Sequence, residues 1–291
     1  MTSTSATQTA ARLERRPSLR KKLRPKYLLY LPLLLMAVFY LLPVYVMLIT
    51  GFKGFEEVNL RTMWDLPSSL KFDNFIEAYK NLAPALWNSF NMVIPAALIS
   101  SFLGSLNGFV LAKWKFRGAD VIFPLLLFGM FIPYQSILIP LVEFMRTINM
   151  YGGLPGLVLT HVIYGIPITT LTFRNYYASI PKELVEAGRM DGTGLLGSYW
   201  YILLPLSLPS FVVVIIWQFT SAWNDFLFAV VLTSPSNWPI TVALNNMAGS
   251  QIIAWNVQMA GSLLAALPTL VIYIFLGRYF LRGLMAGALK G

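Results

Sequence analysis

The feature that most constrains this chain is a series of six long apolar blocks separated by polar segments. They lie at about residues 27–50, 88–112, 119–142, 155–174, 202–232 and 259–281. Each block equals or exceeds the roughly 20 residues that a helix needs to cross the hydrocarbon layer of a bilayer. Backbone polar groups in lipid must bond within their own segment, so blocks of this length form helices. The sequence therefore predicts an all-α membrane protein with six spans.

Composition supports this prediction. Of the 291 residues, 57% are hydrophobic and only 12% are charged, and the mean hydropathy is +0.64. A soluble domain carries about 25% charged residues, so about half of the usual charge is missing. A soluble core would not account for this composition.

The distribution of Lys and Arg predicts the orientation. With the basic segment 1–26 in the cytoplasm, 17 of the 22 Lys and Arg residues fall on the cytoplasmic side. The five on the other side are Lys53, Arg61, Lys71, Lys80 and Arg146. Cytoplasmic loops carry the basic excess, so we expect both termini in the cytoplasm. Segment 1–26 has no base-stacking aromatics around its charges, and we expect it to lie against anionic lipid rather than nucleic acid.

The inventory of reactive residues excludes most enzymatic chemistry. The chain has no cysteine, which rules out disulfides, thiolate catalysis and cysteine metal sites. Its single histidine, His161, lies in an apolar block and is interpreted as a helix-packing residue. No Ser-His-Asp set, phosphate-binding glycine loop or pair of acids is present. We therefore expect a non-catalytic protein with no metal site and no cofactor of its own.

The loop at 178–201, between the fourth and fifth blocks, is charged and broken by glycine. Ser179 is predicted to cap a short helix, with Pro181 in its first turn. Its predicted apolar face holds Ile180, Leu184 and Ala187. Its polar face holds Lys182, Glu186 and Arg189, with Glu183 beside them. A turn at 192–194 leads to a second short helix at about 195–201. The acids Glu183, Glu186 and Asp191 disfavour an interfacial helix on anionic lipid, so the loop is interpreted as a docking element facing the cytosol.

The same loop carries a resemblance to a known family. Glu186-Ala187-Gly188, three residues, Gly192, nine residues and Ile202-Leu203-Leu204-Pro205 resemble the EAA loop of ATP-binding-cassette (ABC) importer permeases. The pattern departs only at Gly188, where the family usually has alanine. Beyond the loop, Trp223 to Phe226 and the tail from Arg278 to Gly291 are similar to the six-span, maltose-transporter-type sugar permeases. Segments 224–229 and 242–246 resemble the glucose/mannose branch.

This resemblance implies a type I importer permease of a bacterial or archaeal plasma membrane. A second homologous permease, two cytoplasmic ATPase subunits and an extracytoplasmic sugar-binding protein would be its partners, and ATP and Mg²⁺ would bind to the ATPases. Glu186 would contact the ATPase, and Gly192 would make the turn. The implied coupling residues are Glu183, Glu186, Ala187, Gly188, Asp191 and Gly192.

Polar residues within the fifth block form a stripe at helical spacing. Its candidate pathway residues are Gln218, Ser221, Trp223, Asn224 and Asp225. An ionisable residue within a span faces the bundle interior or water, and amides, a carboxylate and an indole suit a sugar. The alternative is that the stripe joins neighbouring helices, with Asp225 capping a broken helix. Both interpretations remain open.

Two further expectations concern the whole chain. Glycines 283, 287 and 291 predict that the sixth span of the permease domain, 27–282, ends near Leu281-Arg282, leaving 283–291 as a cytoplasmic tail. The alternative functions are an ion-coupled secondary carrier and a scaffold subunit without a pathway. The absence of internal repeats, and Asp225 as the one acid well inside a span, disfavour the carrier.

Overall fold

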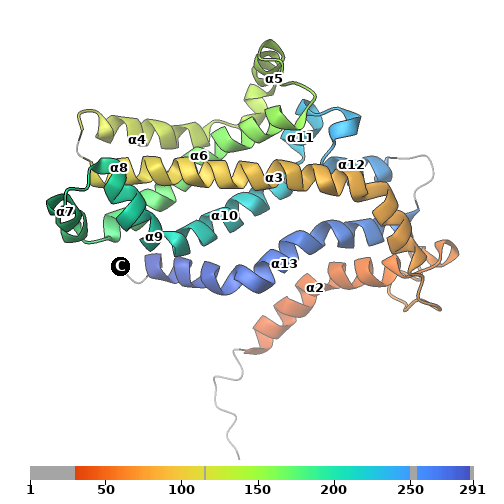
Figure 1. The fold of residues 1–291 in the computed structure, drawn as a ribbon. Helices are drawn as coiled ribbons and strands as arrows, with labels where there is room; N and C mark the ends of the chain where they lie inside the picture. The colour runs from red at the N-terminus through yellow and green to blue at the C-terminus, as the bar shows by residue number, and fades with distance from the viewer. Residues whose placement is uncertain (1–29, 115, 250–253, 289–291) are drawn as a thin grey trace, which may run out of the picture. The chain divides into compact units, whose positions relative to one another are not determined.

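The computed structural model describes residues 30–114, 116–249 and 254–288 (Figure 1). The predicted basic tail 1–26 and the start of the first predicted span lie outside these residues. The chain divides into two compact units, Met1–Val46 and Met47–Gly291. Helix α2 (Tyr30–Gly51) is the described part of the first unit and continues past the boundary. The described residues contain no β-strand, and an isolated bridge pairs Gly152 with Thr233.

The second unit is built from helices throughout. In chain order these are η2 (Phe55–Glu57), α3 (Asp73–Lys113), α4 (Ala119–Phe128), η3 (Gly129–Phe131), η4 (Tyr134–Ile137), α5 (Leu138–Thr147), α6 (Leu154–Ser179), α7 (Lys182–Met190), α8 (Leu195–Gly197), the π-helix η5 (Ser198–Leu203), α9 (Leu204–Leu206), α10 (Leu208–Trp223), α11 (Leu227–Leu232), η6 (Pro235–Asn237), α12 (Ile240–Ala248) and α13 (Trp255–Ala288).

Within the described residues, four helices are long and apolar enough to cross a membrane, or six if each of two bent pairs counts as one span. The predicted block 119–142 corresponds to a pair bent by 90° between Phe131 and Tyr134. The predicted block 202–232 is not one helix, because it bends by 76° after Leu206 and breaks again at 224–226. Proline lacks a backbone N–H, and Pro133 and Pro209 lie at or next to the two bends.

Helices α3 and α6 lie side by side and form the centre of this unit (Figure 1). A Cβ at Gly104 would lie 2.9 Å from the backbone carbon of Thr169, and one at Gly108 would lie 2.6 Å from the backbone nitrogen of Arg174. Small residues let membrane helices approach closely. Thr169 Oγ1 donates to the carbonyl of Ser100 at 3.0 Å, so a hydrogen bond adds to this close contact.

Helices α10 and α13 pack against α3 and complete the core of the second unit. Trp223, at the end of α10, stacks on Phe219 with ring centroids 5.4 Å apart. Its indole Nε1 donates to the carbonyl of Ala265 in α13 at 3.0 Å. These contacts fix the place where α10 ends and the chain turns into α11.

The last helix differs from the prediction at its end. Helix α13 runs to Ala288 and passes through Gly283 and Gly287, so it does not end near Leu281-Arg282. Each interior glycine costs about 1 kcal/mol relative to alanine, but extending a helix that already exists adds one hydrogen bond for each residue fixed. Residues 289–291 lie outside the described part.

Candidate functional site

Helix α7 forms where the sequence predicts it but starts differently. Its N-cap is Pro181, and the first helical residue is Lys182. The hydroxyl of Ser179 donates to the carbonyl of Tyr176 at 2.7 Å, so it serves the end of α6 rather than the start of α7. The prediction of Ser179 as the cap is therefore wrong. Glu183 in the first turn and Arg189 in the last turn both favour the helix dipole.

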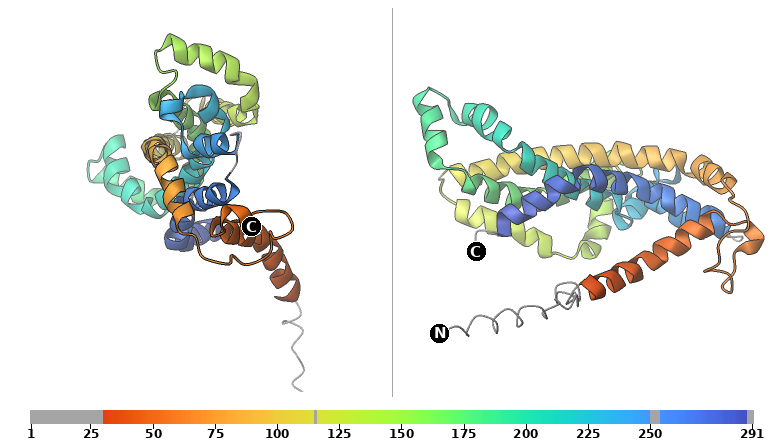
Figure 2. Two further views of the ribbon diagram at one scale, coloured as in Figure 1. Left: turned by 90° about the vertical axis from the view of Figure 1, so that its right-hand side faces the viewer. Right: turned by 90° about the horizontal axis from the view of Figure 1, so that it is seen from below.

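The buried face of α7 also differs from the predicted one. Val185 and Gly188 are buried, whereas Leu184 and Ala187 are exposed. Ile180 precedes the helix and does not share its face. The opposite face presents Glu183, Glu186, Ala187 and Met190 to the outside. Lys182, Leu184 and Arg189 are exposed as well, so the exposed side of this helix carries charges of both signs. The helix lies at one end of the second unit (Figure 2).

Two glycines give the loop its shape. A Cβ at Gly188 would press against the Cδ1 of Ile202 and lie 3.0 Å from Thr193 Oγ1. With the Ile202 side chain as it lies in the structure, only glycine fits at this position without a shift, whereas the family pattern has alanine. Gly192 has a φ of +83°, which glycine adopts without steric cost. The predicted turn at Gly192 is confirmed, and the exposed Asp191 immediately precedes it.

Buried hydroxyl groups connect the end of the loop to the spans. Ser105 Oγ of α3 lies 2.6 Å from the hydroxyl of Tyr177 in α6 and 3.0 Å from that of Tyr199 in η5. Tyr177 donates to Ser207 Oγ at 3.0 Å. All four side chains are fully buried. We call these residues the hydroxyl cluster. The sequence does not predict this cluster, although serine and tyrosine hydroxyls within apolar helices could have pointed to it.

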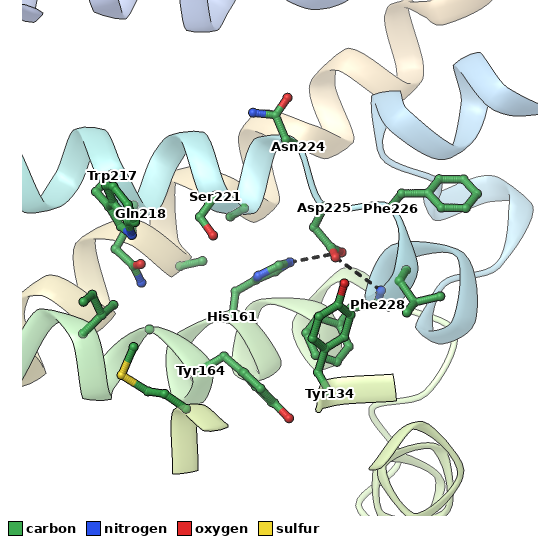
Figure 3. Close-up of a pocket in the computed structure, with 17 residues that line it drawn as sticks. Tyr134, His161, Tyr164, Trp217, Gln218, Ser221, Asn224, Asp225, Phe226 and Phe228 are labelled. Atoms are coloured by element: carbon green, nitrogen blue, oxygen red, sulfur yellow. Dashed lines mark hydrogen bonds and ion pairs between the residues drawn. The ribbon is translucent and has the colours of Figure 1, made fainter. Parts of the chain in front are cut away.

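A cavity of about 630 Å³ lies between α3, α6, α10, α11 and the bend before η4 (Figure 3). Its lining includes Tyr134, His161, Tyr164, Trp217, Gln218, Ser221, Asn224, Asp225 and Phe228. The break between α10 and α11 turns the end of the predicted polar stripe towards α6. Most of the candidate pathway residues therefore line one cavity.

Asp225 and His161 face each other across this cavity (Figure 3). His161 Nε2 lies 3.5 Å from Asp225 Oδ2, and the two side chains are 10% and 13% exposed. Asp225 also accepts from the backbone N–H of Ala229 at 3.0 Å and of Phe228 at 3.4 Å. The structure is therefore compatible with both interpretations of Asp225: it caps the start of α11, and it also lines the cavity. His161 was interpreted as a packing residue, and the structure places it in the cavity wall.

Of the other stripe residues, Gln218, Ser221 and Asn224 line the cavity and Trp223 does not. Gln218 Nε2 donates to Ser100 Oγ at 3.0 Å, and Ser221 lies on the side of α10 that faces His161 (Figure 3). Asn224 lines the cavity but points away from His161, and its amide donates to the carbonyl of Thr220 at 2.8 Å. Trp223 does not line the cavity, because its ring lies in the core.

A second cavity, of about 750 Å³, lies beside α7. Lys113, Lys182, Glu186 and Arg189 line it, and Lys113 Nζ donates to the carbonyl of Ile180 at 2.6 Å. This bond ties the end of α3 to the start of the loop. Across the residues that the structure describes, no group of three or more His, Asp or Glu side chains is placed to hold a metal ion.

Comparison with known sequences identifies the family. Residues 102–284 match the family described as "Binding-protein-dependent transport system inner membrane component". A probable ABC transporter permease protein of Pyrococcus horikoshii is 46% identical over 91% of this chain and 98% of its own length. The glucose import system permease protein GlcU of Saccharolobus solfataricus is 35% identical over 91% of this chain and 96% of its own. The xylose/arabinose import permease protein XacI of Haloferax volcanii is 35% identical over 86% and 89%.

Comparison with solved structures supports the fold. The crystal structure of a bacterial ABC transporter involved in the import of the acidic polysaccharide alginate matches with a TM-score of 0.74. The match covers 88% of this chain and 97% of the other, at 20% sequence identity. With its fold, its EAA-type loop and these relatives, the chain belongs to the ABC importer permeases, as a type I inner membrane component for carbohydrate import.

Proposed function

We propose that this chain is the non-catalytic permease subunit through which an ATP-driven importer passes a monosaccharide of the glucose/mannose type. Two cytoplasmic ATPase subunits bind ATP and Mg²⁺ and drive it, and a second homologous permease completes the pathway. An extracytoplasmic binding protein delivers the sugar. Relatives named for glucose and for xylose/arabinose import support the substrate class. A similar fold occurs in an alginate ABC transporter solved with its periplasmic protein, which supports the delivery route.

The observation that carries this proposal is the pair of exposed acids, Glu183 and Glu186, on α7. Val185 and Gly188 attach the helix to the protein, so Glu183 and Glu186 are presented on the opposite side. Exposed carboxylates on a fixed helix can pair with basic groups of a partner. With both termini in the cytoplasm, this face meets the ATPase, and Gly192 and the neighbouring Asp191 set the turn that follows.

Substitution of Glu186 tests the coupling role. We expect Glu186→Ala to insert and assemble with the partner permease but to lose most ATPase binding and sugar uptake. Glu77→Ala is the matched control, because Glu77 is an exposed helical acid of α3 outside the loop. ATPase co-purification and uptake in proteoliposomes are the measurements. Normal uptake by a well-expressed Glu186→Ala complex would exclude the role of this residue.

The same system separates the proposal from an ion-coupled carrier. Uptake should require ATP inside the proteoliposomes, and it should persist when ionophores remove proton and sodium gradients. Uptake that follows an ion gradient and ignores ATP would support the carrier instead.

A further inference from the structure

We propose that the cavity around Asp225 is a binding site for one neutral sugar within this subunit, in which His161 and Asp225 together bind a sugar hydroxyl. This inference rests on the proposed function and deepens it, because it places the sugar in this chain rather than only in the partner permease. It also adds residues outside the predicted stripe, namely His161, Tyr134 and Tyr164.

The size and the walls of the cavity suit a small ring compound. Its volume of about 630 Å³ lies within the range of small-molecule sites, roughly 300–1,000 Å³. Three rings pack against Phe228 on one side of the cavity. The centroid of Phe228 lies 5.3 Å from that of Tyr134, 5.0 Å from that of Tyr164 and 6.0 Å from that of His161. These rings supply apolar faces for the C–H surface of a sugar. Both tyrosines also bring a hydroxyl that donates and accepts.

The hydrogen-bonding groups of the Asp225–His161 pair are not fully used. Asp225 Oδ1 accepts one backbone N–H, from Phe228, and a carboxylate oxygen has two lone pairs. His161 Nε2 is buried and makes no hydrogen bond within the described residues, and its ion-pair contact with Asp225 Oδ2 is long, at 3.5 Å. A buried polar atom without a hydrogen bond is costly. A sugar hydroxyl placed beside the pair would bond to both residues and remove that cost.

The charge of the cavity selects against acidic ligands. Asp225 is the one carboxylate among its lining residues, and the lining includes no lysine or arginine. A ligand carboxylate would meet the charge of Asp225 with no lysine or arginine in the lining to offset it, in surroundings that screen charge weakly. The alginate transporter, which has a similar fold, is involved in the import of an acidic polysaccharide. The present cavity, with one acid and no lysine or arginine, fits an uncharged monosaccharide better than an acidic one.

The absence of native cysteines allows a direct test. Ser221→Cys places a single thiol of this chain in the cavity, and Ser236→Cys is the matched control, on an exposed residue of η6. The complete importer, in nanodiscs and without binding protein, is treated with N-ethylmaleimide in the presence of D-glucose or D-glucuronate. Labelling of this chain is followed by mass spectrometry. We expect D-glucose to protect Ser221→Cys at concentrations about tenfold or more below those of D-glucuronate, and neither sugar to protect Ser236→Cys.

Charge removal provides the second arm. In the Ser221→Cys background, Asp225→Asn should reduce the difference between the concentrations of D-glucose and D-glucuronate that protect the thiol. The amide still accepts a hydrogen bond but carries no charge. Asp120→Asn, on an exposed carboxylate of α4, should leave the difference unchanged. Equal protection by both sugars, or no protection in a complex that transports sugar, would overturn the inference. A complex that shows no ATP-dependent transport would instead contradict the proposed function. If Asp225→Asn does not assemble, the Ser221→Cys comparison decides alone.

Discussion

At the scale of single residues, the contact between Gly188 and Ile202 is the most specific feature of the loop. The atom nearest to a Cβ at Gly188 would be Ile202 Cδ1, which valine lacks. We therefore expect Gly188→Ala to lower stability by about 1–3 kcal/mol, the usual cost of overpacking. Adding Ile202→Val should restore most of the loss. Thermal unfolding of the purified complex measures both effects.

The control for this pair is Gly54→Ala, because a Cβ at Gly54 would meet no atom within 4 Å. It should leave the unfolding temperature nearly unchanged. If Gly188→Ala is as stable as the wild-type protein, or if Ile202→Val does not restore it, another feature must explain the glycine. Full stability of Gly188→Ala would mean that the Ile202 side chain rotates away at little cost.

At the scale of elements, the hydroxyl cluster joins the π-helix η5 to α3, α6 and the start of α10. Tyr199→Phe removes one hydroxyl from the cluster and keeps the ring that packs 5.4 Å from Phe109. We expect a loss of about 1 kcal/mol in stability, the usual net contribution of a hydrogen bond. Sugar uptake per ATP hydrolysed should also fall, since η5 links the loop to the spans. Tyr201→Phe is the matched control, because Tyr201 is 79% exposed. An unchanged coupling ratio in Tyr199→Phe would show that the cluster is structural only.

The same elements show what sequence patterns can and cannot predict. The length of the apolar blocks predicted the helices, because backbone N–H and C=O groups in lipid must bond within their own segment. The turn at Gly192 was predictable, because glycine tolerates its φ. The buried face of α7 was not, because it is set by residues outside the helix: Val185 packs in a core cluster with Phe109 and Tyr177. The position of His161 in the cavity wall was also missed, because it depends on the break between α10 and α11 that brings Asp225 next to it.

At the scale of the whole molecule, the two candidate functional regions lie on elements that share one core. Helix α6 carries His161 in the cavity wall and Tyr177 in the hydroxyl cluster. Helix α3 carries Ser100, which bonds Gln218 of the cavity, and Ser105, which bonds both tyrosines. A movement of α7 against the spans would therefore reach the cavity through α3 and α6. The proposed coupling of an ATPase to a sugar site would use this connection.

The chain's end offers a final test at this scale. Helix α13 contains an apolar stretch long enough to span, within Trp255–Tyr279, and the helix continues to Ala288. Segment 284–291 carries Lys290 as its one charged residue, which is too little for stable attachment to lipid at about 1 kcal/mol per basic residue. The resemblance to six-span sugar permeases implies instead that this end reaches between the ATPase subunits. Deleting 284–291 should leave membrane insertion and thermal stability unchanged, because the span itself is intact. ATPase stimulation by the loaded binding protein should change.

If the truncated complex hydrolyses ATP and transports sugar like the full-length complex, the end of α13 has no part in coupling.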